Sequence, residues 1–267
     1  MAKTKFARSE TSETIRFMLK LALLVFVLRS FLFAPFSIPS ESMLPRLLIG
    51  DYLFVSKWNY GYSRWSMPWG LPLIPGRVFG KDPTRGDIVV FRSMEPDDHD
   101  VIKRVIGLPG DTIEVKRGQV MLNGTAIPKQ RIADFTLPLT PNFTAQTCGA
   151  TFVDVDSSGA AICRYPRYRE TLPGGRSYTV LDQATIPRAD DTGAYTVPAD
   201  TVFLMGDNRD ASADSRFAPP VGMGYIPMER IEGKAVVGFF STDGSASWLL
   251  PWTWFSAARW ERIGEGF

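Results

Sequence analysis

The chain of 267 residues contains few metal-binding side chains and little excess charge. It has one histidine, His99, and two cysteines, Cys148 and Cys163, which are too few soft ligands for a structural zinc site. We therefore expect no metal or other cofactor. The net charge is only +2, and no basic tract is interleaved with aromatic residues, which disfavours a nucleic-acid partner. Hydrophobic residues make up 45% and charged residues 22%, which argues against wholesale disorder and a polytopic membrane protein.

One long apolar run occupies residues 17–36. As a helix rising 1.5 Å per residue, it would span roughly 30 Å, the thickness of a bilayer's hydrocarbon core. Its charged residues, Lys20 and Arg29, lie towards opposite ends, where long side chains can reach the headgroups. We therefore expect one transmembrane helix over 17–36.

The basic residues on either side of this run predict its orientation. Four precede it: Lys3, Lys5, Arg8 and Arg16. The first basic residue after it is Arg46. The positive-inside rule then places residues 1–16 in the cytoplasm and residues 37–267 in an exported domain. We expect a single-pass protein of the cell inner membrane, with this domain on the periplasmic side.

A cleaved secretory signal is the alternative interpretation of this segment, because it also combines a basic start with an apolar stretch and small residues. The stretch of about twenty residues is longer than the usual signal core of 7–15. Pro35 also interrupts the sequence at 34–37, where a cleavage site of the small-x-small type would be needed. An uncleaved anchor is therefore the preferred interpretation.

After the apolar run the sequence consists of short apolar segments separated by turn residues, as in a mostly β protein. Strands are expected at residues 52–55, 88–91, 101–106, 112–115, 120–122, 202–205 and 235–240. Asn123-Gly124 and the Pro-Gly-Asp at 109–111 are strong turn signals. No long stretch outside 17–36 has clean helical periodicity, so we expect an antiparallel β-sheet of sandwich or barrel type. Insertions are expected at about 58–81 and 129–187.

Two segments are rich in tryptophan. Trp58, Trp65 and Trp69 fall in the first insertion, and four more lie near the C-terminus: Trp248, Trp252, Trp254 and Trp260. Any one of these rings could simply fill the core. Their clustering beside Pro and Gly in a membrane-tethered chain instead favours surfaces that enter the membrane interface, where Trp is enriched.

Both cysteines lie in the insertion at 129–187. The environment of an exported domain is oxidising, so a Cys148–Cys163 disulfide is expected. It would close a loop of about fifteen residues and contribute on the order of 3 kcal/mol to the stability of the folded chain. Two unpaired buried thiols would be the better interpretation only if the domain is not exported.

Three segments carry the residues that suggest chemistry. They are IPSESMLP at 38–45, IKRVIGLPGD at 102–111 and MGDNRDASADSR at 205–216. Singly, each has a structural explanation: a helix N-cap, a solvent-facing strand lysine and a polar loop. Together, in this order and after an anchor, and with GDYLFVSK at 50–57 and RGDIVVF at 85–91, they resemble the type I signal peptidases, membrane-bound serine proteases that remove signal peptides from exported proteins.

The resemblance implies that Ser42 is the nucleophile and Lys103 its general base. A serine hydroxyl needs a base to take its proton, and an ammonium group cannot do so. Burial of Lys103 among the apolar residues of its predicted strand would lower its pKa and supply a neutral amine. The lone His99, between Asp98 and Asp100, is expected to be a solvated loop residue, since no G-x-S-x-G motif accompanies it.

The resemblance also implies supporting roles. The oxyanion hole is assigned to the backbone N–H of Ser42 and the hydroxyl of Ser40, whose side chains share one face of an extended chain. Ser212 is expected to orient the amine of Lys103, and Asp214 and Arg216 to form a supporting ion pair.

The short distance from the apolar run to Ser42 bears on the substrate. Six residues extend over at most about 20 Å, so the nucleophile must act at the membrane surface. Signal peptides are cut there, after small residues that shallow apolar pockets would accept, with walls expected from Ile38, Met43 and Val101. Two residues depart from the family pattern, Arg46 and Ala211, which bears on substrate fit and not on the reaction.

The expected function is therefore that of a membrane-bound serine endopeptidase acting on the signal peptides of precursor proteins. A relative with the same dyad but a narrower substrate set, for example in conjugation or pilus maturation, is one alternative. A catalytically silent β domain that binds partners through its Trp-rich surfaces is another. The sequence gives neither the substrate repertoire nor the oligomeric state.

Overall fold

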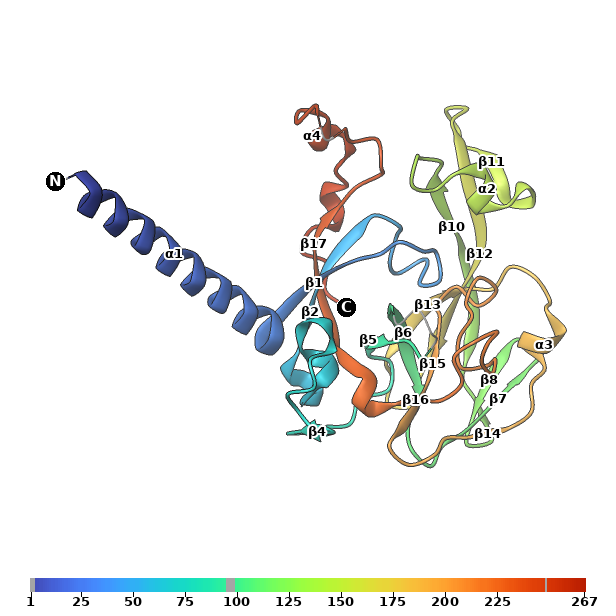
Figure 1. Cartoon of the computed structure of the whole chain (residues 1–267). Coiled ribbons are helices and arrows are strands. Elements are labelled where there is room, and N and C mark those ends of the chain that lie inside the picture. The colour runs from blue at the N-terminus through green and yellow to red at the C-terminus, as the bar shows by residue number, and fades with distance from the viewer. Residues whose placement is uncertain (1–2, 95–98, 248) are drawn as a thin grey trace.

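The computed structural model describes residues 3–94, 99–247 and 249–267, so Asp98 and Trp248 lie outside the described residues. The chain begins with one long helix and continues as a body built almost entirely of antiparallel strands (Figure 1). The α-helices are α1 Lys3–Val27, α2 Ala145–Cys148, α3 Pro187–Asp190 and α4 Thr253–Ala257. The expected mostly β class is confirmed.

The largest sheet has seven strands, and each neighbouring pair is antiparallel. In spatial order they are β1 Phe33–Ser37, β2 Asp51–Ser56, β17 Ile231–Ser241, β5 Ile88–Arg92, β6 Asp100–Gly107, β15 Thr201–Met205 and β16 Ile226–Pro227. Four of the seven were expected from apolar patterning: β2, β5, β6 and β15. The expected strand at 235–240 is the later part of β17, which begins at Ile231.

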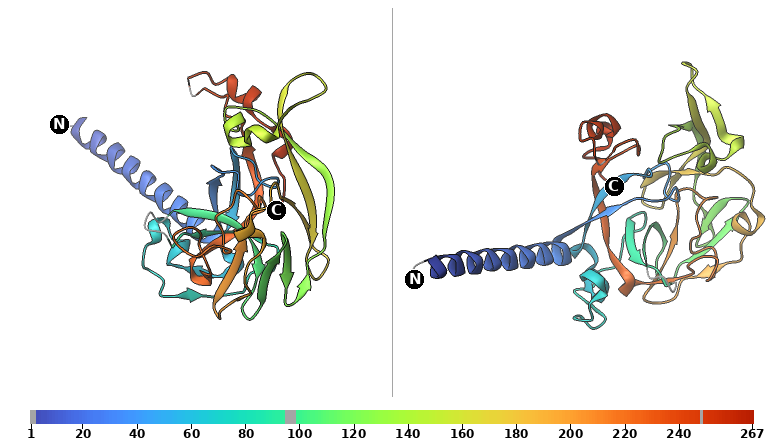
Figure 2. Two further views of the ribbon diagram at one scale, coloured as in Figure 1. Left: turned by 90° about the vertical axis from the view of Figure 1, so that its right-hand side faces the viewer. Right: turned by 45° about the horizontal axis from the view of Figure 1, so that its top comes forward.

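Three smaller sheets complete the body. One contains β14 Tyr195–Thr196, β7 Thr112–Lys116, β8 Gln119–Leu122 and β9 Thr125–Ala126. Another contains β10 Lys129–Pro138, β12 Ala161–Thr171, β11 Val153–Val155 and β13 Ser177–Leu181. The smallest pairs β3 Tyr62–Ser63 with β4 Arg77–Val78. The two segments expected as insertions thus correspond to separate small sheets, and Figure 2 shows β10 and β12 on the far side of the body from α1.

The N-terminal helix differs from the expectation of one transmembrane helix over 17–36. Helix α1 ends at Val27, a π-helical turn covers Leu28–Leu32, and Phe33–Ser37 is strand β1. The expectation of a helix is therefore wrong for the last residues of the run, because they pair with β2 at the edge of the large sheet. Pro35 fits this edge position, where no ladder donor is needed.

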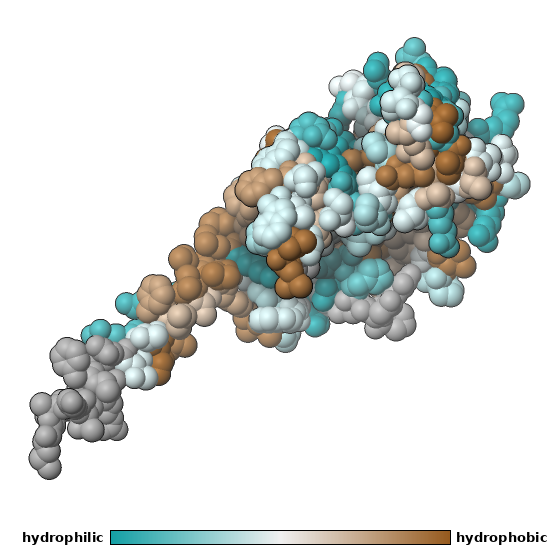
Figure 3. All heavy atoms as spheres, turned by 90° about the horizontal axis from the view of Figure 1, so that it is seen from above, coloured by the Kyte–Doolittle hydropathy of each residue, from teal (hydrophilic) through white to brown (hydrophobic). Residues whose placement is uncertain are grey.

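Helix α1 contains the first part of the apolar run that was expected to span a membrane. No helix in the described part of the chain is both long and apolar enough to cross a bilayer. Figure 3 shows apolar side chains along α1 up to the point where it joins the body.

The Trp-rich segments lie at the surface. Trp58, Trp69, Trp252, Trp254 and Trp260 are all exposed, and Trp65 is half-buried. None of the six described tryptophans fills a core, so the core interpretation is wrong for them.

The expected disulfide is confirmed, because Cys148 and Cys163 are bonded to each other. Its sulfur atoms lie in a cluster with Leu44, Phe143 and Tyr165. The disulfide therefore joins α2 to β12 within an apolar cluster that extends to the segment just after Ser42.

Candidate active site

Ser42 lies at a turn within the long loop between β1 and β2, and apolar anchors fix this turn. Met43, Leu44 and Leu47 are fully buried, and Met43 and Leu47 pack with Ile38 against residues of the large sheet. These buried side chains therefore lock the chain after Ser42 into the core, and Ser42, although largely buried itself, lines a surface cavity.

The backbone of this turn is also held by the loop after β15. The Asn208 backbone N–H donates to Ser42 O at 3.1 Å, and Asn208 Nδ2 donates to Glu41 O at 3.3 Å. A Cβ added at Gly206 would lie 2.6 Å from Ser42 O and 2.3 Å from Ser212 Oγ. Glycine is therefore required where this loop presses against the turn.

Lys103 lies in β6 and points at the turn. Its Nζ is 2.8 Å from Ser42 Oγ and donates to its neighbour's carbonyl, Ile102 O, at 2.9 Å. The side chain is only 4% exposed. Loss of hydration lowers the pKa of Lys103 to about 8, although the negative charges of Asp214 and Asp207 oppose this shift. A large share of the amine is therefore neutral near pH 8 and within reach of the hydroxyl proton.

Ser40 lies beside the pair. Its Oγ is 3.5 Å from Ser42 Oγ, so the two hydroxyl groups reach the same region, as expected from their spacing. Both line a cavity of about 710 Å³ together with Lys103. A peptide carbonyl over Ser42 would therefore meet the Ser40 hydroxyl.

The walls of this cavity agree only in part with the expectation. Ile38 and Val101 line it, and Ala211 and Ala213 supply further small apolar surface. Met43 does not line it, because this side chain is fully buried in the core beneath the turn. The prediction of Met43 as a wall is wrong.

His99 also lines the cavity. The Ser42 hydroxyl is bonded to Lys103 and Ser40 instead. The described contacts therefore place the amine, and not the imidazole, next to the hydroxyl.

The three residues expected to support the dyad fall in one loop. Ser212 is buried, and its Oγ has no hydrogen-bond partner in the described part of the chain, so the expected bond to Lys103 is not formed here. Asp214 accepts from Arg216 Nε and Nη2, each at 2.9 Å, and from the Gly206 N–H at 3.0 Å. Burial alone would raise the pKa of Asp214, but the Arg216 guanidinium holds it below its usual value.

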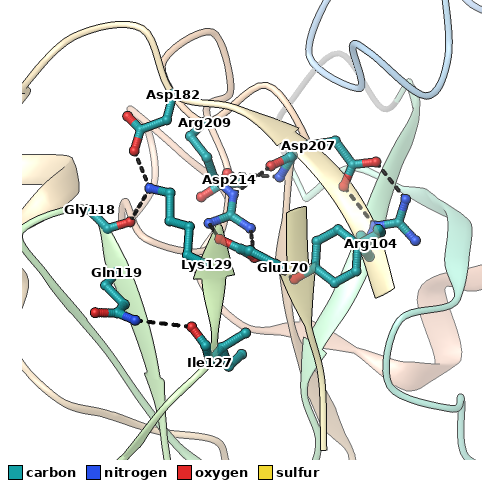
Figure 4. A network of polar contacts seen from close by, with 12 residues as sticks. Arg104, Gly118, Gln119, Ile127, Lys129, Glu170, Asp182, Asp207, Arg209 and Asp214 are labelled. Carbon is teal, nitrogen blue, oxygen red and sulfur yellow. Dashed lines mark hydrogen bonds and ion pairs between the residues drawn. The ribbon is translucent and has the colours of Figure 1, made fainter. Parts of the chain in front are cut away.

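Two further ion pairs hold β6 and β12 to the loop after β15, and both were missed from the sequence (Figure 4). Arg104, the neighbour of Lys103, donates to Asp207 at 2.7 and 2.6 Å. Arg209 donates to Glu170 of β12 at 2.8 and 2.5 Å. All four side chains are buried, so the loss of one partner would leave a charge unpaired.

These two pairs differ in how visible they are in the sequence. Arg104 and Asp207 lie inside the motifs that contain Lys103 and Ser212, so adjacency to those residues was a usable signal. Glu170 lies in the polar insertion, and nothing in its sequence context links it to Arg209.

The C-terminal residues clamp the segment after Ser42. Arg46 Nη1 binds Glu265 at 2.6 Å, and Arg46 Nη2 binds Gly266 O. The guanidinium also lies 5.2 Å from the centre of the Phe267 ring. The residue that departs from the family pattern thus has a structural role in this chain.

Three carboxylates lie close enough to be considered as cation ligands: Asp182, Asp190 and Asp210 have oxygens within 4.8 Å of one another. Asp182 is already paired with the Lys129 ammonium. Backbone N–H groups bind the other two. These contacts account for the position of the cluster, and we assign it no ligand.

Comparison with known proteins gives consistent matches. A family model described as "Signal peptidase, peptidase S26" matches residues 11–240. Signal peptidase I of Rickettsia typhi (strain ATCC VR-144 / Wilmington) is 37% identical over 226 residues, covering 81% of this chain and 75% of the relative. Signal peptidase I of Rickettsia akari (strain Hartford) is 34% identical over 257 residues, covering 90% and 85%.

One solved structure is also similar in sequence. It is a signal peptidase I from Enterococcus faecalis V583, 25% identical, with 58% of this chain and 97% of that chain covered. The TM-score is 0.29, which is too low to support a statement about the fold.

Proposed function

Because the chain belongs to the signal peptidase family, peptidase S26, we infer that it is a serine endopeptidase that removes signal peptides from exported precursor proteins. The observation that supports assigning this activity to particular residues is the 2.8 Å contact between Lys103 Nζ and Ser42 Oγ in a surface cavity. The large antiparallel sheet is the framework that holds both residues.

In the first half of the reaction, the neutral amine of Lys103 takes the proton of Ser42 Oγ as this oxygen attacks the scissile carbonyl carbon. The Ser42 N–H and the Ser40 hydroxyl stabilise the oxyanion. The Lys103 ammonium then gives its proton to the nitrogen of the leaving chain, and the signal peptide remains as an ester on Ser42. The mature protein departs with a free amine.

In the second half, the regenerated neutral amine takes a proton from water, which attacks the ester carbonyl. Collapse of the second tetrahedral intermediate returns the proton to Ser42 Oγ and releases the signal peptide as a carboxylic acid. Lys103 thus acts as base and then as acid during acylation of Ser42, and in the same order again during hydrolysis of the ester. The lowered pKa of about 8 allows both roles close to neutral pH.

Small residues before the cut fit the cavity walls. Ile38, Val101 and Ala211 present apolar surface beside the dyad, which would accept an alanine methyl group. The ion pair of Asp214 with Arg216 holds the loop that follows β15 in place, and Ser212 of the same loop packs against Gly206.

We place the protein in the cell inner membrane as a single-pass anchor, with residues 1–16 cytoplasmic and the β body periplasmic. The helical part of the apolar run, residues 17–32, covers about 24 Å at 1.5 Å per residue, which is shorter than a bilayer core of about 30 Å. Exposed aromatics at the base of α1, Phe33 and Trp58, are suited to the interface beyond it. Local thinning of the bilayer would accommodate the difference.

The test is cleavage of a precursor protein by the full-length chain in detergent or vesicles. Wild type is expected to release the mature protein, whereas Ser42→Ala and Lys103→Ala are expected to release none while remaining folded. His99→Ala, a matched change of another cavity residue, is expected to keep nearly all activity. Loss of cleavage in His99→Ala with normal folding would contradict the dyad, and a wild type inactive on every precursor would favour the silent binding domain.

A further inference from the structure

A second cavity lies between α1 and the first Trp-rich segment. It measures about 840 Å³ and is lined on one side by α1 and on the other by residues of the loop that include Trp65, Met67 and Trp69. No residue of the dyad lines it. The signal peptidase reaction described above therefore leaves this cavity without a role.

The residues of α1 that line the cavity follow a helical face. Met18, Leu21, Ala22 and Val25 of α1 belong to the lining, as does Arg29 in the π-helical turn that follows α1. Separations of three or four residues put most of this lining on one side of the helix. Met18, Leu21 and Val25 are exposed. This face of α1 therefore presents an apolar stripe to a space that nothing in the described part of the chain fills.

The second cavity is continuous with the catalytic one. Arg29, Phe36 and Asp100 line both, so an extended chain passing over Ser42 can enter the second cavity without crossing the body. Phe36 lies in β1, next to the turn that carries Ser42. The strand thus joins the apolar stripe of α1 to the catalytic groove.

The charged groups at the inner end of the cavity are paired. Lys57 Nζ lies 2.8 Å from Glu232 Oε2, and Arg92 binds Asp100. Lys57 and Arg92 therefore each have a carboxylate beside them, and most of the rest of the wall is apolar. Such a site suits an apolar segment with no charges of its own.

We propose that this cavity binds the apolar core of the signal peptide, lying along the exposed face of α1, while the cleavage site occupies the groove over Ser42. The proposal rests on the proposed peptidase function. A signal peptide has 7–15 apolar residues a short distance before its cut, so the two parts must bind together. The shared lining residues supply that connection.

Trp69 and Phe79 provide a matched pair of variants. Both rings belong to the same segment and are exposed, at 87% and 83%, and both residues have positive φ, at 58° and 54°. Only Trp69 lines the cavity. Trp69→Ala and Phe79→Ala therefore remove similar exposed rings from similar backbone positions, with little effect expected on folding.

The experiment compares two substrates for each variant: a full precursor and a short peptide that contains the cleavage site but lacks the apolar core. Trp69→Ala is expected to raise KM for the precursor about tenfold, the equivalent of about 1.4 kcal/mol, with kcat unchanged. The short peptide should be cleaved as by wild type. Phe79→Ala should match wild type on both substrates.

Several results would overturn the proposal. They are an unchanged precursor KM in Trp69→Ala, an equal loss on the short peptide, or an equal loss in Phe79→Ala, which would indicate a general membrane-contact role for the segment. If wild type cleaves neither substrate, the proposed function itself fails, which is a different outcome.

A second measurement locates the substrate directly. A photoreactive benzoylphenylalanine is placed at position 69 or at position 79 in the Ser42→Ala protein, which holds the precursor uncut. Crosslinking from position 69 should map to the apolar core of the precursor, and position 79 should give none. Adducts at position 69 with lipid only would overturn the proposal.

Discussion

Replacement of Lys103 by methionine is expected to stabilise the folded protein at low pH and to destabilise it at high pH. The amine is buried, and its pKa is lowered from an ordinary value of 10.5 to about 8. Because the buried ammonium loses its hydration, this difference lowers the free energy of unfolding of wild type by about 3 kcal/mol at low pH. Methionine has a similar length and carries no such penalty.

The sign follows from proton binding. Below pH 8 both folded and unfolded wild type hold the proton, and the folded state carries the full penalty. Between pH 8 and 10.5 the unfolded chain binds the proton and the folded chain does not, so wild type gains stability as pH rises. Above this window the penalty has disappeared.

The variant also loses two hydrogen bonds, those of Lys103 Nζ to Ser42 Oγ and Ile102 O, worth about 1–2 kcal/mol together. Asp214 and Asp207 keep their arginine partners, so no carboxylate is left unpaired. Lys103→Met should therefore be more stable than wild type by about 1–2 kcal/mol at pH 6 and less stable by a similar amount near pH 11.

The assay is urea unfolding of the full chain in detergent at pH values from 6 to 11, with wild type and variant side by side. Lys116→Met is the control for the change from lysine to methionine, because the Lys116 side chain is 58% exposed. A stability difference between Lys103→Met and wild type that is the same at every pH would refute the account of a desolvated amine.

Three other changes test separate parts of the structure. Ser40→Ala should lower kcat by roughly 10²–10³ with little change in KM, while Ser40→Thr keeps much of the rate; an unchanged kcat in Ser40→Ala would remove the hydroxyl from the oxyanion hole. Replacement of both Cys148 and Cys163 by serine should lower the free energy of unfolding in urea by about 3 kcal/mol and leave cleavage at low temperature intact. A matching loss of cleavage would link the disulfide-bonded region to catalysis. Arg46→Thr removes an ion pair with Glu265 that is about a third exposed, together with the contacts to Gly266 O and the Phe267 ring, and should cost about 1 kcal/mol. It should leave kcat within about twofold, and a larger loss of kcat would give the C-terminal clamp a role in positioning Ser42.

The strands of the body could be predicted where their side chains alternate or form short apolar runs between turns. β5 and β6 are of this kind, and both carry buried residues along most of their length. β10 is different, since exposed and half-buried residues follow one another along it, so no period of two marks a core face. The sheet around it was therefore expected only as an insertion.

The end of the N-terminal helix could not be located from the sequence. An apolar run has the same composition whether it continues as a helix or becomes a buried strand, and only the pairing of Phe33–Ser37 with β2 decides between them. Motif order was sufficient to single out Ser42 and Lys103. The pairing of Glu170 with Arg209 depends on how two distant segments meet, which motif order does not contain.

The pH dependence of covalent labelling at Ser42 tests the dyad most directly. A serine-directed acylating probe is applied between pH 6 and 10, and the modified residue is located by peptide mapping in wild type and in Lys103→Arg. The account predicts an adduct on Ser42, formed at a rate that rises with pH to a plateau with a midpoint near the Lys103 pKa of about 8, and no adduct in Lys103→Arg, whose guanidinium stays protonated. Acylation of a different serine, or labelling of Ser42 at the wild-type rate in Lys103→Arg, would contradict it.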